Sequence, residues 1–412
     1  MNENKYRLTK YACYTANLSM SVVGTLSPLL FLTFFHLYGI SFAMLGALVF
    51  INFFTQLLVD LFFSFYSHRI KIEKAVKLTP VLTVLGLFIY AVFPYIFPDS
   101  VYTGLVIGTV IFAASGGFVE VLISPVIAGI PSRNPEREMS RLHSVYAWGV
   151  VAVVILSTLF LMCFGKENWQ ILAFIGMSVP LVSSILFFMA QIPPLRGPEK
   201  PSNVVSLIRK KDFLLCFLCI LFGGASECTM SQWSSGFLEQ ALNIPKVWGD
   251  VFGVAMFALM LGLGRTLYSK YGKNIHKVLV LSAAGAVLCY LTAAISNIAL
   301  VGMAACALTG FCTAMLWPGS IIIASDQFPS SGVAVFALMA AGGDLGGALG
   351  PQLVGTITDI MIKNENVIRW AGSLDLAADQ LGMKIGLLCA VIFPIAAVVI
   401  LSIIYRNHTH NT

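Results

Sequence analysis

Long apolar runs recur from one end of the chain to the other, and they limit the fold more than any other feature. Of the 412 residues, 58% are hydrophobic and only 11% are charged, whereas soluble proteins carry about 25% charged residues. A run of about 20 apolar residues can cross the hydrocarbon core of a bilayer as a helix. Because backbone groups find no water there, spanning segments must bond internally, as helices do. The sequence therefore predicts an all-α integral membrane protein.

Twelve apolar runs are separated by polar or proline-containing breaks. The longest connection, residues 191–211, is rich in proline and ends in three basic residues. This composition is typical of a linker, so we expect an N-terminal six-helix half at 1–190 and a C-terminal six-helix half at 212–412. The twelve predicted transmembrane helices cover roughly residues 8–37, 40–67, 75–97, 101–128, 138–164, 168–190, 212–239, 246–270, 276–295, 298–324, 331–361 and 381–405.

The basic residues fall unevenly on the two sides of the membrane. If the N-terminus lies inside, that side receives most of them, and the other side receives only Lys166, Lys246, Lys363, Arg369 and Lys384. By the positive-inside rule, both termini are expected in the cytoplasm, with the chain in the inner (plasma) membrane. The net charge of +6 thus indicates orientation and contact with the lipid bilayer rather than a nucleic-acid partner.

The two halves carry a weak internal repeat in their fourth helices. Residues 117–125 align with residues 310–318, and Gly, Phe and Pro match at identical spacing. Glu120 then corresponds to Thr313, so the acid is an addition to one half only. Parallel repeats of this kind occur in secondary transporters whose substrate site lies near the midplane, at the interface between the repeats.

Over essentially the whole chain, these features resemble the major facilitator superfamily. Helix four is similar to that of the fucose-permease-like sugar:proton symporter branch, because Gly116, Gly117, Glu120 and Pro125 occupy the places of its Gly pair, Glu and Pro. The resemblance implies a monomeric transporter that couples sugar movement to protons, without a cofactor. That branch also has an Asp in helix one, but residues 21–28 contain no acid, so its coupling residues cannot simply be transferred.

Three ionisable residues inside predicted helices are candidates for proton coupling: Glu120, Glu227 and His143. An Asp at the centre of a membrane helix costs at least about 2.5–3.5 kcal/mol, and such groups usually face a cavity. Glu227 lies in helix seven, the counterpart of helix one, and is the natural replacement for the missing acid. Histidine changes its charge near neutral pH. For each residue, the alternative is a hydrogen-bonded structural group.

Polar and aromatic residues within the helices are candidates for substrate contacts. An amide can both donate to and accept from a hydroxyl, so Gln232 beside the Trp233 ring suits a sugar. The alternatives are that Trp233 is an interfacial anchor and that the polar stripes hold helices together. The candidates are Asn17, Asn52, Gln56, Tyr146, Gln232, Trp233 and Trp317.

An arginine inside a membrane helix needs a partner, because an unpaired charge is costly there. Arg265 in helix eight is therefore expected to form a structural or gating ion pair, with Asp344 or Asp326 supplying the carboxylate. Asp60 and Arg69, towards the cytoplasmic end of helix two, are the other gating candidates.

The sequence thus favours a secondary active transporter that moves a small polar solute, most simply a sugar, together with protons. The first alternative is a drug–proton antiporter; helix five lacks its G-x-x-x-G-P motif, although residues 346–351 in helix eleven are similar. A receptor without transport is a further alternative. No nucleophile–base set or phosphate loop indicates an enzyme, and Cys216 and Cys219 have no second pair that would predict a metal site.

Overall fold

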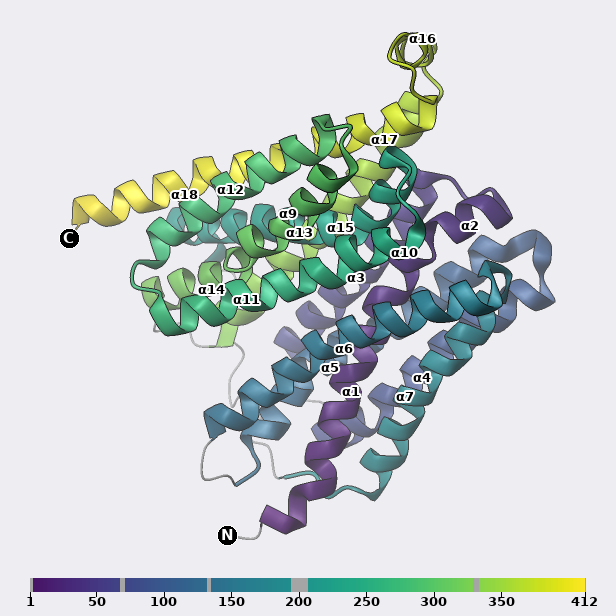
Figure 1. Cartoon of the computed structure of the whole chain (residues 1–412). Helices are drawn as coiled ribbons and strands as arrows, with labels where there is room; N and C mark the ends of the chain where they lie inside the picture. The colour runs from purple at the N-terminus through teal and green to yellow at the C-terminus, as the bar shows by residue number, and fades with distance from the viewer. Residues whose placement is uncertain (1–2, 67–70, 132–134, 194–206, 329–332, 412) are drawn as a thin grey trace. The chain divides into compact units, whose positions relative to one another are not determined.

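The computed structural model describes residues 3–66, 71–131, 135–193, 207–328 and 333–411, and all regular secondary structure in these ranges is helical (Figure 1). Within them, ten helices are long and apolar enough to cross a membrane, and the bent pair α1 (Arg7–Leu29) and α2 (Phe31–Tyr38) would make eleven. The prediction of an all-α membrane protein is confirmed. The count of twelve is consistent with the structure but stays a prediction.

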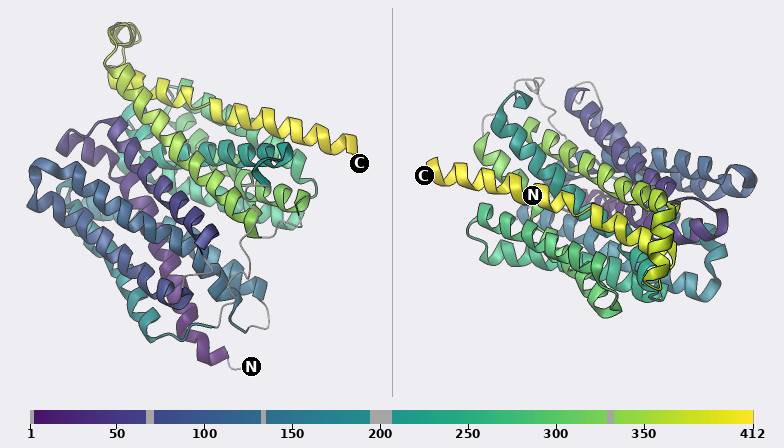
Figure 2. Two further views of the ribbon diagram at one scale, coloured as in Figure 1. Left: turned by 180° about the vertical axis from the view of Figure 1, so that it is seen from behind. Right: turned by 90° about the horizontal axis from the view of Figure 1, so that it is seen from above.

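The chain divides into two compact units, residues 1–33 with 51–201 and residues 34–50 with 202–412. The first unit contains α1, most of α3, and α4 to α7. Figure 2 shows these helices from two further directions. Residues 194–206, most of the predicted linker, lie outside the described ranges. The helices of this unit after α1 are α3 (Phe42–Tyr66), α4 (Ile72–Ile96), α5 (Val101–Ala128), α6 (Pro135–Phe164) and α7 (Trp169–Met189).

Close packing of α4 on α5 organises the first unit. A Cβ atom at Gly86 would lie 2.6 Å from the Phe112 backbone nitrogen, and one at Gly108 would lie 2.7 Å from Tyr90 Cβ. Both distances are shorter than side-chain atoms tolerate, so only glycine lets the two backbones come this close. Small residues therefore set the spacing of these helices, as expected where lipid provides no hydrophobic drive between them.

The second unit is built around α9, the longest helix of the described chain. It packs most extensively against α15, and α17 and α18 run on to the C-terminus, in yellow in Figures 1 and 2. Its elements from the linker onwards are α9 (Lys211–Leu242), α10 (Lys246–Trp248), the π-helical η5 (Gly249–Ala255), α11 (Met256–Tyr271), α12 (Ile275–Ile295), α13 (Ala299–Thr313), α14 (Leu316–Gln327), α15 (Val333–Ile362), α16 (Glu365–Ser373), α17 (Ala378–Cys389) and α18 (Ile392–Asn411).

Residues 34–50 precede the linker in sequence but belong to the second unit. The carboxylate of Asp359 on α15 accepts hydrogen bonds from the backbone N–H groups of Phe42 and Ala43, each at 2.9 Å. These donors lie at the start of α3 and have no partner within their own helix. A negative charge also interacts favourably with a helix N-terminus. Asp359 therefore caps α3 and holds residues 34–50 against α15.

Candidate transport site

One candidate group is a pair of carboxylates in the first unit. Glu120 lies on the apolar α5 with its side chain exposed, and Asp60 on α3 is only 3% exposed. One carboxylate oxygen of each lies within 4.8 Å of the other. Two carboxylates at this separation repel one another when both are ionised. The arrangement can therefore hold one proton between two acids.

The Gly pair of helix four has a geometric role in this arrangement. A Cβ atom at Gly117 would lie 2.9 Å from Val59 Cβ, and one at Gly116 would lie 3.4 Å from the Gln56 side chain. Gly117 thus lets α5 lie directly on α3, whereas a Cβ atom at Gly116 would meet a contact at the edge of the ordinary van der Waals range. This close approach brings Glu120, one turn later on α5, near the Asp60 carboxylate.

Another candidate group, described by itself, is an ion pair in the second unit. Arg265 Nη2 lies 3.2 Å from Glu227 Oε1, and the side chains are 44% and 14% exposed, respectively. The carboxylate thus comes from Glu227 and not from the expected Asp344 or Asp326. Asp344 is buried on α15, whereas Asp326 is exposed near the end of α14.

A break in the tenth predicted span explains the second contact of Arg265. The span divides into α13 and α14 just after Thr313. Pro318 has no N–H, so it cannot donate to the carbonyl of Ala314, four residues earlier. Arg265 Nε donates to this carbonyl instead, at 3.0 Å. A Cβ atom at Gly264 would lie 2.6 Å from Ala314 Cβ, so glycine at that position allows α11 to approach the break.

The two candidate tryptophans have packing roles. Trp233 is 1% exposed and donates its indole N–H to the Pro351 carbonyl at 2.9 Å. Trp317 follows the helix break, and its ring packs directly on Gly343. A Cβ atom at Gly343 would lie only 2.4 Å from the ring. Trp233 is therefore packed inside the second unit and is neither an interfacial anchor nor an open ring surface. We leave it out of the proposed site.

Several polar candidates of the first unit connect helices. Asn17 Nδ2 donates to the Leu142 carbonyl at 2.6 Å, and Ser21 donates to the Tyr146 carbonyl at 2.9 Å, so polar groups of α1 are bound to α6. These contacts match the alternative interpretation of the polar stripe as helix–helix packing.

The remaining candidates differ in their exposure. Gln56 is buried, Asn52 and Gln232 are half-buried, and Tyr146 is 41% exposed. The side chain of His143 and all of Arg69 lie outside the described residues.

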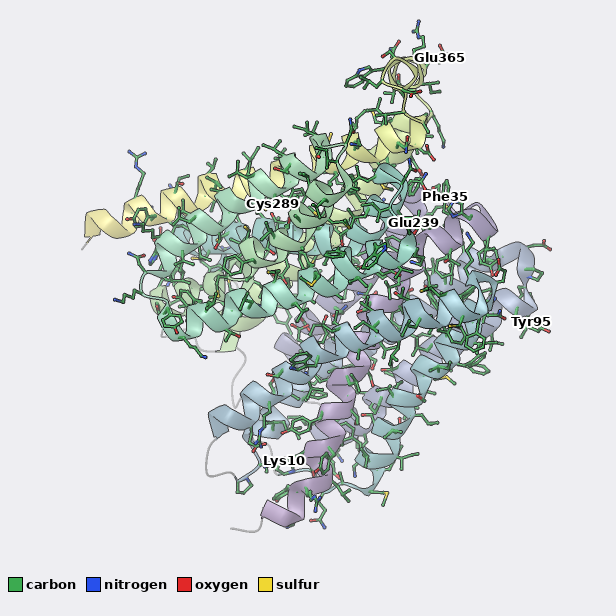
Figure 3. The ribbon with its side chains drawn as sticks, viewed as in Figure 1. Lys10, Phe35, Tyr95, Glu239, Cys289 and Glu365 are labelled. Atoms are coloured by element: carbon green, nitrogen blue, oxygen red, sulfur yellow. The ribbon has the colours of Figure 1, made fainter. Side chains whose placement is uncertain are left out.

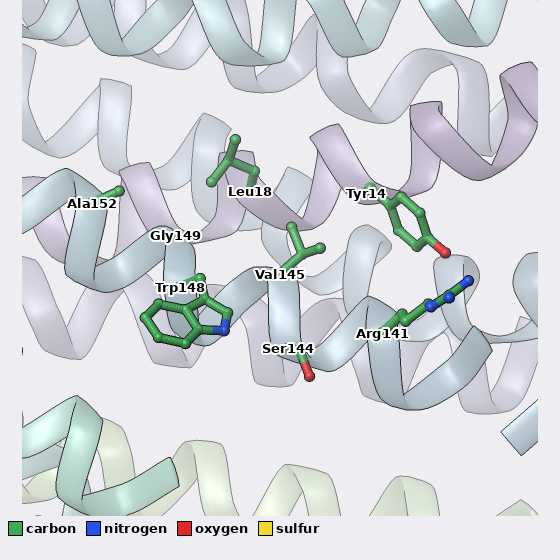
Figure 4. A pocket seen from close by; sticks show the side chains of 8 residues that line it. All are labelled: Tyr14, Leu18, Arg141, Ser144, Val145, Trp148, Gly149 and Ala152. Atoms are coloured by element: carbon green, nitrogen blue, oxygen red, sulfur yellow. The ribbon is translucent and has the colours of Figure 1, made fainter. Parts of the chain in front are cut away.

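A cavity of 560 Å³ opens beside α1 and α6 in the first unit (Figure 4). The Tyr14 hydroxyl and the Arg141 guanidinium lie together at one end, and the Trp148 ring lies further along. Trp148 is 67% exposed, so its indole is open to a ligand. The eight lining residues are Tyr14, Leu18, Arg141, Ser144, Val145, Trp148, Gly149 and Ala152.

Sequence reasoning did not select Tyr14, Arg141 or Trp148 as site residues. The lining residues Tyr14 and Leu18 of α1 are four positions apart. Those of α6 repeat at the same spacing, at Arg141, Val145 and Gly149, so each helix presents one face to the cavity. The four-residue spacing was the only sign in the sequence that these residues share a helix face. It does not show that the faces of α1 and α6 line the same cavity.

Glu138 lies beside the polar end of this cavity, where it contacts Tyr14 and Arg141. It belongs to the part of α6 that precedes the apolar span. It accepts a hydrogen bond from Tyr14 Oη at 3.0 Å and pairs with Lys10 at 3.4 Å and Arg141 at 3.2 Å; Lys10 is labelled in Figure 3. Burial by itself raises the pKa of Glu138, but the bond from Tyr14 and the two cationic partners outweigh it and hold this pKa below its ordinary value. Glu138 is thus a firmly held, ionised group.

Comparison with known proteins identifies the family. The family model of the Major Facilitator Superfamily matches residues 12–358, so the chain belongs to this superfamily of membrane transporters and is a multi-pass membrane protein. No curated protein sequence matches the chain.

Solved structures across the superfamily share the fold. A bacterial homologue of the human lysosomal transporter Spinster, inward-facing and occupied, is 15% identical with a TM-score of 0.73, over 97% of this chain and 96% of its own. The nucleoside transporter NupG is 13% identical with a TM-score of 0.71, over 97% and 99%. The E. coli fucose:proton symporter is 15% identical with a TM-score of 0.60, over 95% and 98%. At these identities the likeness shows the fold alone.

Proposed function

We propose that this transporter moves a small polar solute, a sugar or sugar derivative, by alternating access coupled to protons. The observation that carries the proposal is the Glu120–Asp60 pair, two carboxylates of the first unit within 4.8 Å of one another inside apolar helices. From the charge asymmetry of the loops we further propose that the chain lies in the inner membrane with both termini in the cytoplasm.

The acid pair provides a reason for coupling. An acid inside the membrane is costly when ionised, and a second acid beside it adds repulsion. A proton from water removes this repulsion, and its release restores it. A conformational change that exposes the pair to one side and then to the other therefore responds to the pH on each side.

The cavity of the first unit supports a polar solute of sugar size. Its volume of 560 Å³ falls within the usual range of about 300–1,000 Å³ for small-molecule sites. The Tyr14 and Ser144 hydroxyls and the Arg141 guanidinium can bond to hydroxyl groups, and the open Trp148 ring can cover an apolar face. The likeness of helix four to fucose-permease-like symporters favours a sugar.

Transport in proteoliposomes tests this proposal. With an acidic bath, wild-type protein should accumulate labelled solute from a panel of sugars and sugar acids, and a protonophore should abolish the accumulation. Glu120→Gln should lose accumulation against a gradient while retaining exchange, because the amide cannot carry the proton. Glu365→Gln, on the exposed α16, is the matched control and should transport as wild type. Normal accumulation by Glu120→Gln would show that Glu120 is structural.

A further inference from the structure

We infer that Arg265 and Glu227 form the binding site for an anionic group of the solute, so that the transported compound is a sugar acid with a carboxylate. This inference rests on the proposed function, because it names the class of solute that the transporter carries.

The geometry leaves the guanidinium able to take another ligand. Nη2 is directed to Glu227 at 3.2 Å and Nε to the Ala314 carbonyl at 3.0 Å. Arginine has five N–H donors. Among the described residues, Arg265 donates only to Glu227 and to the Ala314 carbonyl. The side chain is 44% exposed. A planar guanidinium with open donors matches a carboxylate better than it matches a single hydroxyl.

The contacts of Arg265 lie near the middle of two apolar spans, where a charged group is costly. Glu227 lies near the middle of the 32-residue α9, and Ala314 lies at the break near the middle of the span 299–327. Broken helices near the membrane midplane are where transporters of this kind bind polar groups. A charged arginine at that depth is stable only with an anionic partner.

The carboxylate of Glu227 is only partly satisfied. Its Oε1 pairs with Arg265, whereas its Oε2 is buried and has no hydrogen-bond partner among the described residues. The titratable groups that interact with this pair through Cys228 on α9 include Asp344 on α15 and Tyr290 on α12, whose hydroxyl donates to the Ser226 carbonyl at 2.7 Å. Lys246 on α10 pairs with Asp250 on η5, and Asp250 accepts a hydrogen bond from the Ser235 hydroxyl of α9.

An exchange of partners would couple the anion to a proton. When a solute carboxylate takes the place of Glu227 on Arg265, Glu227 is left as an unpaired anion inside the membrane, which is costly. A proton from the adjacent water can bind Glu227 and remove this charge. The site then holds one cation and one anion both before and after binding. The one bond that forms is the O–H bond of the Glu227 carboxyl, whose proton comes from hydronium and leaves water behind, so one proton enters with one anion.

A neutral sugar does not produce this exchange. A sugar hydroxyl brings no charge to the Arg265 guanidinium, whereas a carboxylate adds Coulomb attraction and can accept two parallel N–H bonds. A sugar hydroxyl therefore competes poorly with the Glu227 carboxylate for Arg265, and a solute carboxylate competes on equal terms. The site is selective for the charge of the solute.

Matched pairs of solutes test this inference in wild-type proteoliposomes: galactose with galacturonate, and glucose with glucuronate. We expect uptake of the acid to exceed that of its neutral partner by about tenfold, because only the acid adds a charged, bidentate contact to Arg265. The dissociation constant of the preferred acid should tighten by up to about tenfold per unit fall in pH, as linkage to one proton requires.

Variants locate the effect at the two residues. Arg265→Gln should lose acid uptake, Arg265→Lys should retain part of it, and Glu227→Gln should bind the acid independently of pH. Arg369→Gln, on the exposed α16, is the matched control and should behave as wild type. Size-exclusion and thermal-unfolding profiles identify any variant that fails to fold.

The outcomes separate the two proposals. Proton-dependent uptake of the neutral sugars that does not change in Arg265→Gln or Arg265→Lys would overturn the anion site and leave the proposed function standing. Failure to bind or transport any sugar or sugar acid would overturn both.

Discussion

Each unit of this transporter holds one glutamate against one arginine, and the two pairs differ in what else holds the glutamate. The shortest N–O distance is 3.2 Å in both, and the glutamates have similar exposures, 12% for Glu138 and 14% for Glu227. Glu138 also binds Tyr14 and Lys10, on a part of α6 outside the apolar span. Glu227 lies inside a span, and Oε2 has no hydrogen bond among the described residues.

The difference separates a structural contact from one that can exchange. A carboxylate with three donors at the membrane surface gains little from taking a proton, because each donor favours the ionised form. A carboxylate with a single partner inside the membrane becomes unstable when that partner leaves, and a proton restores its neutrality. The same two residue types thus fix α6 to α1 in one unit and form an exchangeable pair in the other.

The largest expected effect comes from removing the carboxylate inside the membrane. Glu227→Ala leaves Arg265 without its anionic partner inside an apolar span and should destabilise the fold by up to about 3 kcal/mol, less than a fully buried pair would cost because Arg265 is 44% exposed. Glu227→Gln keeps an acceptor for Nη2 and should lose less. Thermal unfolding in detergent measures both. If both variants unfold at the wild-type temperature, the pair does not stabilise the folded protein and the contrast with Glu138 fails.

Removing the carboxylate at the membrane surface should cost less and should depend on pH. Glu138→Gln loses two ion pairs but keeps an acceptor for Tyr14, so we expect a loss of about 1–3 kcal/mol near pH 7. The pKa of Glu138 is lower in the folded protein than in the unfolded chain. Its contribution is therefore fully present above the unfolded value of about 4.3 and is lost as the pH falls through the folded value.

Unfolding temperatures of wild type and Glu138→Gln, measured from neutral to acidic pH, check this sign. The gap between the two proteins should be wide at neutral pH and should narrow below about pH 4. A gap that widens on acidification would mean that Glu138 is protonated in the folded protein at neutral pH.

The smallest effect is expected at the exposed end of the surface pair. Arg141 is 53% exposed, and pairs with an exposed partner contribute about 0.2–1 kcal/mol. Arg141→Gln should therefore lower the unfolding temperature slightly, and the difference should shrink at high salt because exposed charges are screened. The effect of Arg265→Gln should shrink less at high salt, because the pair lies inside an apolar span and Glu227 is only 14% exposed. Equal salt dependence in the two variants would place both pairs at the surface.

Much of the fold could be predicted from the sequence, because lipid makes apolar length informative. The predicted span 101–128 coincides with α5 (Val101–Ala128), and the span 276–295 differs from α12 (Ile275–Ile295) by one residue. Breaks within spans were not predictable. Pro28 precedes a bend and Pro318 follows a break, but Pro180 lies inside the continuous helix α7. A proline in the sequence therefore does not tell whether its helix stays continuous.

The site was less predictable, because its contacts join distant parts of the chain. The sequence singled out Glu227 and Arg265 separately, and the requirement for a partner was sound. Helical spacing cannot pair residues 38 positions apart, however, and the expected carboxylates were different ones. Tyr14 and Glu138 are 124 positions apart. Trp233 shows a related difficulty: an indole suits a ligand, an interface and a core, and its burial and its bond to the Pro351 carbonyl support packing.

Proton transfer at a carboxylate inside the membrane is the central claim, and infrared difference spectroscopy of the reconstituted protein measures it most directly. When the bath is acidified, wild-type protein should gain a carboxylic-acid C=O band that is missing in Glu120→Gln and present in Glu138→Gln, because the surface glutamate stays ionised. A band that persists unchanged in Glu120→Gln, or a wild-type protein with no such band, would contradict this account.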